Sequence, residues 1–186
     1  MLWQFITENI LNGREKRSKM LIKRIIIHWS AGTYYPNTYE KQCYHYLVDK
    51  NGKIYEGIYK PEDNVNCQDG LYATHTGGGN TGSIGIAMCA MAGFKNPQNV
   101  GSYPITLAQF EACMKLCAGL CHKYMIEINP LNVMTHYEFG QKNPNTSSSG
   151  KIDIIFLPPY AWVPKDDVGS FIRSKIRWYK QKYYGG

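Results

Sequence analysis

One stretch of this chain decides how the rest is arranged: Leu21-Ile22-Lys23-Arg24-Ile25-Ile26-Ile27-His28. Its apolar run predicts a buried strand, and this strand stops at an imidazole. A second apolar run, Val133-Met134-Thr135, stops at the imidazole of His136, and the carboxylate of Asp153 follows further along the chain. Two imidazoles and one carboxylate can converge into a zinc site that keeps its fourth position open. Such a site is catalytic in kind, because water bound there is acidified and can attack a carbonyl.

Further strands are predicted on both sides of a tight turn and in the middle of the chain. Asn51-Gly52 is a strong hairpin signal, because a type I′ turn needs residues that accept a positive φ. The strands that flank this turn are predicted over Tyr44–Asp49 and Lys53–Glu56. Another strand is predicted over Ser83–Ala90, where larger apolar residues alternate with smaller ones.

Two long helices are predicted in the second half of the chain. The first begins with a capping box at Thr106, and the last begins near residues 166–167. Three cysteines lie one turn apart on the apolar face of the first helix: Cys113, Cys117 and Cys121. This spacing favours small core residues in a reducing compartment over disulfide or zinc partners. Since strands and helices interleave, we expect an α/β fold with a mixed central β-sheet flanked by helices.

The composition fits one domain preceded by a short extension. With 186 residues, of which 44% are hydrophobic and 19% charged, the chain can bury the core of a single domain. We expect this domain over residues 20–186 and an extension over residues 1–19, in which residues 2–11 have the pattern of a short amphipathic helix. The extension does not resemble a signal peptide, so we expect synthesis in the cytoplasm. Its apolar and basic residues fit two alternatives, peripheral contact with an anionic membrane and a helix that packs on the domain.

The net charge of +7 indicates an anionic partner. Nucleic acid, a membrane face and an acidic cell-wall polymer all meet this requirement. Nucleic acid is not expected, because the sequence has no recognisable recognition helix and no aromatic-basic strand motif. No apolar run approaches the length of a transmembrane helix.

An ordered set of short motifs carries a resemblance to a known family. The set consists of Ile27-His28-Trp29-Ser30-Ala31, Tyr44-His45-Tyr46-Leu47-Val48, Asn51-Gly52-Lys53-Ile54-Tyr55-Glu56-Gly57, His75-Thr76 with Asn80 and Ser83-Ile84-Gly85-Ile86, Thr135-His136, and Lys151-Ile152-Asp153. In this order the motifs resemble zinc-dependent N-acetylmuramoyl-L-alanine amidases of the amidase-2 branch. That branch includes phage lysozyme-like amidases and is related to peptidoglycan recognition proteins. The resemblance covers roughly residues 21–165 and implies a fold like that of the peptidoglycan recognition proteins.

The resemblance also implies a role for each residue of the site. His28, His136 and Asp153 correspond to the ligands of a catalytic Zn²⁺ ion, with water in the fourth position. Tyr44 resembles the tyrosine that orients this water. Lys151 resembles the lysine that stabilises the tetrahedral oxyanion. Asp153 is followed by Ile154-Ile155 where many relatives have Pro-Gly, so Glu138 is kept as an alternative carboxylate ligand.

Two loops are expected beside the cleft. His75, Asn80 and Ser83 surround a glycine-rich segment, and the resemblance implies that they contact the muramyl or stem-peptide part of the substrate. The polar segment 143–150 lies between His136 and Asp153 and is longer than in compact relatives. We expect it to be a mobile flap over the cleft.

The resemblance implies a zinc amidase that cleaves the bond between N-acetylmuramic acid and L-alanine in peptidoglycan or muropeptides. The alternative is a peptidoglycan-binding module on the same fold that does not catalyse. We expect a monomer. Two settings fit the absence of a signal peptide: a phage or prophage endolysin that acts on the bacterial cell wall, and a muropeptide-recycling enzyme that acts in the cytoplasm.

Overall fold

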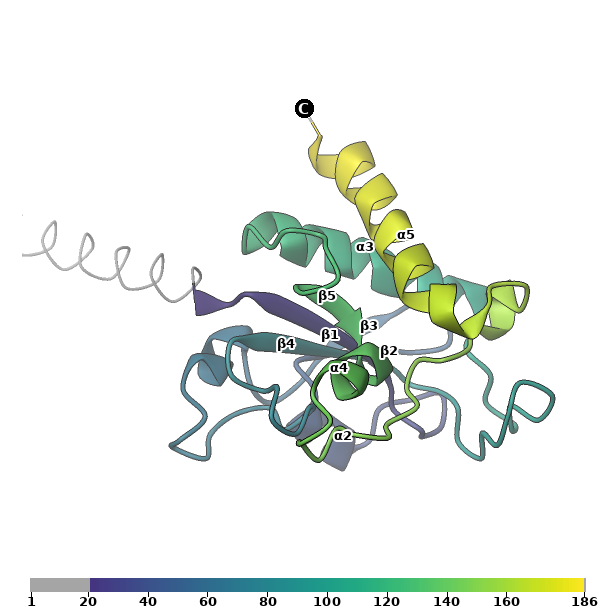
Figure 1. The fold of residues 1–186 in the computed structure, drawn as a ribbon, viewed down its shortest axis with the longest axis horizontal. Coiled ribbons are helices and arrows are strands. Elements are labelled where there is room, and N and C mark those ends of the chain that lie inside the picture. Colours follow the sequence, from purple (N-terminus) through teal and green to yellow (C-terminus); the bar gives the residue numbers. More distant parts are fainter. Residues whose placement is uncertain (1–20, 186) are drawn as a thin grey trace, which may run out of the picture.

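The computed structural model describes residues 21–185 and contains a five-stranded mixed sheet with helices on both sides (Figure 1). The strand order is β3-β2-β4-β1-β5. The α/β fold with a mixed central sheet is therefore confirmed. The predicted amphipathic helix over residues 2–11 and the boundary at residue 20 lie outside the described residues.

The central strand β1 (Arg24–Trp29) is the predicted buried strand. It is parallel to β4 (Ser83–Met88) on one side and to β5 (Val133–Thr135) on the other. Its three isoleucines are fully buried, as expected for a parallel strand that is covered on both faces. The strand starts at Arg24, later than predicted, and it continues one residue past His28.

The predicted hairpin is present with shorter strands, β2 (Tyr46–Val48) and β3 (Ile54–Glu56), which pair antiparallel. Gly52 has a φ of 83°, but Asn51 has no positive φ, and the Gly52 N–H donates to the carbonyl of Asp49, so the turn is not of the predicted type I′. Tyr44 does not belong to β2. It ends a short helix, α2 (Thr38–Cys43), and its backbone N–H donates to the carbonyl of Glu40.

The two long helices, α3 (Leu107–Lys123) and α5 (Val168–Tyr184), pack on each other and cover one face of the sheet (Figure 1). The capping box at Thr106 is confirmed, and Cys113, Cys117 and Cys121 are buried in the core under α3. All six cysteines are free. The last helix begins just after the predicted position, because residues 165–167 form a 3₁₀ turn.

The opposite face of the sheet carries the shorter helix α4 (His136–Lys142). Ile25 and Ile27 belong to the core under α3 and α5, whereas Ile26 packs with Phe139 of α4. Because side chains alternate along a strand, His28 points to the same face as Ile26. The first histidine is thus placed on the side of the sheet where α4 lies.

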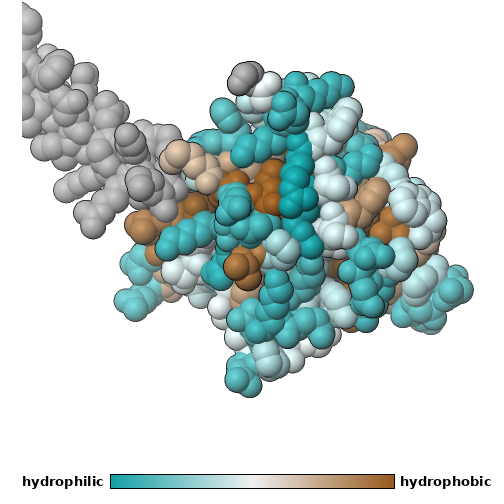
Figure 2. Space-filling view, turned by 45° about the horizontal axis from the view of Figure 1, so that its top comes forward, coloured by the Kyte–Doolittle hydropathy of each residue, from teal (hydrophilic) through white to brown (hydrophobic). Residues whose placement is uncertain are grey.

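The surface is mostly hydrophilic, with smaller hydrophobic patches, on the face that Figure 2 presents. The buried side of α5 consists of residues such as Ile172 and Ile176, and its outer side exposes Trp178 and Lys182. Within residues 21–185 no helix combines the length and the apolarity that a bilayer crossing requires.

Candidate metal centre

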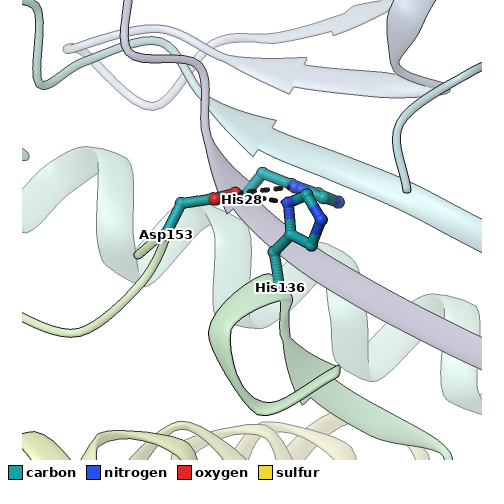
Figure 3. A group of neighbouring side chains, drawn as sticks. All are labelled: His28, His136 and Asp153. Carbon is teal, nitrogen blue, oxygen red and sulfur yellow. Dashed lines mark hydrogen bonds and ion pairs between the residues drawn. The ribbon is translucent and has the colours of Figure 1, made fainter. Parts of the chain in front are cut away.

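The two histidines meet because two neighbouring parallel strands end at the same edge of the sheet. Ile27 of β1 is paired with Thr135 of β5, so the residues that follow them in sequence are His28 and His136. Their ring centroids are 4.6 Å apart (Figure 3). The sequence prediction that these two imidazoles converge is therefore confirmed.

A capping box fixes His136 at the first position of α4. The Thr135 hydroxyl accepts from the backbone N–H of Glu138, and the Glu138 carboxylate accepts from the backbone N–H of Thr135. The same carboxylate forms an ion pair with Arg173 of α5 at 2.9 Å. Glu138 thereby holds the start of α4, and it does not belong to the candidate metal group found among residues 21–185.

Asp153 supplies the third group. Its Oδ2 atom lies 2.8 Å from Nδ1 of His28 and 3.1 Å from Nδ1 of His136 (Figure 3). All three side chains are buried, and one possible ligand atom from each lies within 4.8 Å of the others. Two imidazoles and one carboxylate at this spacing fit the donor set of a catalytic zinc ion, which takes three protein ligands.

The electrostatics of the group also fit a metal. Burial alone raises the pKa of Asp153, but the close imidazoles of His136 and His28 outweigh burial and hold this pKa at about 2. Burial lowers the pKa of His28, although the neighbouring Asp153 opposes this shift. An ionised carboxylate and a neutral imidazole are the forms in which these side chains bind a metal.

A cavity of about 480 Å³ opens beside the three groups. Its lining includes His75, His136 and Asp153 together with the two predicted catalytic residues, Tyr44 and Lys151. A second cavity of about 560 Å³ lies at the opposite end of β1, around Leu21 and Arg24, and contains none of these groups. The cavity at the histidines is therefore the candidate active-site cleft.

Tyr44 and Lys151 differ in their surroundings. The Tyr44 ring lies 5.2 Å from the His28 ring, and burial together with the charge of Asp153 raises the pKa of its hydroxyl. Tyr44 consequently remains a hydrogen-bond donor at neutral pH. Lys151 is exposed, and its backbone N–H donates to the carbonyl of Ser148. The cleft thus has a neutral hydroxyl on one part of its wall and a cation on another.

The three predicted substrate contacts have different positions. His75 lies in the cavity wall, buried, with Nδ1 2.8 Å from the Thr76 hydroxyl and with no partner for Nε2. Gly85 makes room for this ring, because a Cβ there would overlap it. Asn80 accepts from the backbone N–H of Thr76, and the hydroxyl of Ser83 accepts from Arg24. Asn80 and Ser83 do not line the cavity. Asn80 holds the loop and Ser83 is bonded at the strand, and the contact of either residue with substrate stays a prediction.

The polar segment 143–150 differs from the expected mobile flap. Its Ser148 is fully buried, with Oγ 2.9 Å from Nε2 of His136 and donating to the carbonyl of Gly77 at 2.8 Å. The segment is therefore anchored to His136 and to the Gly77 loop, and none of its residues lines the cavity. The sequence contained no signal for this contact, because Ser148 stands in a run of similar hydroxyl residues.

Two further histidines, His45 and His122, make structural contacts. His45 bonds Asn64 through Nε2 and accepts from the backbone N–H of Gly85 through Nδ1, so both of its ring nitrogens are used. His122 is exposed and stacks on Tyr184. Neither histidine belongs to the candidate metal group of the described residues.

Comparisons with solved structures give only distant similarities. The chain is 18% identical to the N-acetylmuramoyl-L-alanine amidase LysC from Clostridium intestinale URNW, over 63% of this chain and 72% of that one, with a TM-score of 0.42. It is 20% identical to AmiD from E. coli, over 83% of this chain and 57% of that one, with a TM-score of 0.49. A mutant structure of PlyL is 22% identical over 83% and 84% of the two chains, with a TM-score of 0.48. No curated protein sequence matches the chain.

A family model provides the stronger comparison. The model described as N-acetylmuramoyl-L-alanine amidase matches residues 18–152, which is most of the chain. The matched residues include both histidines of the candidate metal centre, Tyr44 and Lys151, and they end one residue before Asp153. The chain therefore belongs to the N-acetylmuramoyl-L-alanine amidase family.

Proposed function

We propose that this protein hydrolyses the amide bond between the lactyl group of N-acetylmuramic acid and L-alanine, with Zn²⁺ as its cofactor. One observation carries the proposal: the buried group of His28, His136 and Asp153 adjoins a cavity that His136 and Asp153 line together with Tyr44 and Lys151. Membership of the amidase family supports the same reaction.

Each residue of the site would have a different role in this hydrolysis. When bound, zinc would polarise the carbonyl of the scissile amide and acidify a water molecule. Lys151 offers a positive charge to the carbonyl oxygen as negative charge develops there. Tyr44 offers a protonated hydroxyl beside His28, which can orient the attacking water. His75 lines the cavity, has no hydrogen-bond partner for its buried Nε2, and is proposed to contact the substrate.

The experiment is purification with metal analysis, followed by digestion of sacculi and of soluble anhydro-muropeptides. The expected result is one zinc per chain, and release of stem peptides that begin with L-alanine, identified by mass. Loss of this release after treatment with a chelator, and its return with added zinc, would support the reaction. A protein that binds muropeptide and releases no peptide would be a non-catalytic binding module. The same digestion separates the two settings, since an endolysin would prefer sacculi and a recycling enzyme would prefer the soluble fragments.

The N-terminal extension, residues 1–19, is proposed to contact an anionic membrane and to contribute nothing to the chemistry. Every proposed ligand and catalytic group lies at or after His28. A protein that begins at Met20 should therefore bind zinc and cleave soluble muropeptide at nearly the full rate. Weaker binding to anionic vesicles with unchanged melting would support the membrane role. A large loss of thermal stability would instead indicate that the extension packs on the domain. We propose that the enzyme acts as a monomer, which light scattering would test.

A further inference from the structure

Both histidines of the metal centre are also held at the ring nitrogen that points away from Asp153. Nε2 of His136 lies 2.9 Å from the hydroxyl of Ser148. Nε2 of His28 lies 3.3 Å from the hydroxyl of Thr76. The two hydroxyls belong to different loops, and each is buried, with Ser148 and Thr76 both fully inaccessible to solvent. Each Nε2 atom therefore faces one buried hydroxyl that solvent does not reach.

The hydrogen of the Ser148 hydroxyl is already used. It is donated to the carbonyl of Gly77 at 2.8 Å, and a carbonyl can only accept. The Ser148 oxygen can therefore only accept a hydrogen bond from His136. Nε2 of His136 must then carry a hydrogen and donate it to Ser148.

This assignment determines the other nitrogen of the same ring. In neutral His136, a hydrogen on Nε2 leaves a lone pair on Nδ1. That lone pair faces Oδ2 of Asp153 at 3.1 Å, close to Nδ1 of His28. Two acceptors that face each other in a buried site call for a cation between them. The Ser148 contact therefore prepares His136 to bind a metal through Nδ1.

We propose that Ser148 is a positioning residue of the metal centre, which holds the hydrogen of His136 on Nε2 and turns the Nδ1 lone pair toward the metal. The inference rests on the proposed zinc-dependent function. It assigns to the segment 143–150 a part in metal binding in place of the expected flap. Hydrogen-bond partners of this kind fix the tautomer and the orientation of metal-binding histidines.

The surrounding backbone holds Ser148 in place. The backbone N–H of Ser148 donates to the Thr146 hydroxyl at 3.3 Å, and the backbone N–H of Lys151 donates to the carbonyl of Ser148 at 3.2 Å. Gly77 and Gly140 leave the room that this segment occupies, because a Cβ on either residue would overlap it. One short segment thus carries the positioning hydroxyl, the cation of Lys151 and the carboxylate that follows.

The Thr76 hydroxyl constrains His28 less than the Ser148 hydroxyl constrains His136. Its hydroxyl lies between Nε2 of His28 at 3.3 Å and Nδ1 of His75 at 2.8 Å. Both of these neighbours are imidazoles, so the Thr76 hydrogen has two possible acceptors, whereas Ser148 faces one imidazole and one carbonyl. The longer distance and the shared hydrogen predict a smaller effect for Thr76 than for Ser148.

The test compares three variants by their zinc affinity, measured by competition with a chromophoric chelator. Ser148→Ala removes the hydroxyl, Ser148→Thr keeps it, and Ser149→Ala removes an exposed neighbouring hydroxyl as the matched control. We expect Ser148→Ala to bind zinc about 10–100-fold more weakly than the wild type, as for other lost partners of metal-binding histidines. Ser148→Thr should recover most of the affinity, and Ser149→Ala should match the wild type.

A second measurement does not depend on any variant. In the zinc-loaded wild type, the ¹⁵N spectrum of the His136 ring should show the hydrogen on Nε2 and a metal-bound Nδ1. The opposite tautomer would overturn the proposal, even if Ser148→Ala failed to fold. Equal zinc affinity in Ser148→Ala and the wild type would also overturn it, and would leave the amidase proposal intact. A wild-type protein that binds no zinc would refute the amidase proposal as well.

Discussion

The ion pair between Arg173 and Glu138 is expected to stabilise both the fold and the start of α4. Arg173 Nη1 lies 2.9 Å from one carboxylate oxygen of Glu138 and 3.0 Å from the other, and it also donates to the carbonyl of Val133. The carboxylate caps α4, whose first residue is His136. Arg173→Met would keep the apolar stem of the side chain and remove its charge. Glu138 would then be left without its counterion.

The burial of the two side chains sets the size of the effect. The Arg173 side chain is 8% exposed and that of Glu138 is 21% exposed. Removing one partner of a buried ion pair typically lowers the free energy of unfolding by about 3–5 kcal/mol. Because Glu138 keeps some contact with water, we expect the lower end of this range, about 3 kcal/mol. For a domain of this size such a loss corresponds to a melting temperature about 6–12 °C lower.

Urea denaturation of the metal-free protein measures this change directly. The double variant Arg173→Met with Glu138→Gln removes the uncompensated charge, so it should recover part of the stability that the single variant loses. An exposed substitution on the same helix, Lys182→Met, is the control and should change little. A single-variant loss below about 1 kcal/mol would refute the reasoning, since it would fall in the range of exposed pairs. A double variant no more stable than Arg173→Met alone would also refute the reasoning.

Three further predictions concern the metal centre. His28→Ala or His136→Ala should lose zinc and amidase activity and keep the fold, which metal analysis and circular dichroism would check; full activity without metal would contradict the site. Asp153→Ala should weaken zinc binding, and Asp153→Cys should retain it because a thiolate is also a zinc ligand; unchanged affinity in Asp153→Ala would require another third ligand. Lys151→Ala should keep one zinc per chain and lower turnover by about a hundredfold to a thousandfold, with a smaller loss for Tyr44→Phe; a loss of metal in either variant would contradict this division of roles.

The central part of the fold could be predicted because it depends on local patterns. An unbroken run of isoleucines indicated a strand covered on both faces, and the two apolar runs that end in His28 and His136 indicated that the two imidazoles converge. The capping box at Thr106 fixed the start of α3. A similar signal, Asn37 with Glu40 three residues later, marks the start of α2 and explains why Tyr44 ends a helix and does not begin a strand.

The contacts that complete the site could not be read from the chain. Ser148 bonds His136 and Gly77, which lie 12 and 71 residues away in sequence, and no pattern distinguishes it from the hydroxyl residues beside it. Ser83 was expected near substrate because it lies close to the glycine-rich loop in sequence. It lies at the start of β4, where its hydroxyl accepts a hydrogen bond from Arg24. Long-range pairing of polar groups depends on which loops meet, and local propensity carries no information about this.

The structure separates the candidate metal ligands from the residues proposed to act on substrate. His28 lies within β1, His136 follows β5, and both are buried, so their positions depend on the core of the sheet. Lys151 is exposed on a loop, and it is free to adjust to the oxygen on which charge develops. Asp153 stands between these two kinds of group, because its carboxylate is buried against both imidazoles while its backbone belongs to the loop that carries Lys151. A substitution that loosens this loop should therefore lower metal affinity and turnover together, whereas one that removes only the Lys151 charge should lower turnover alone.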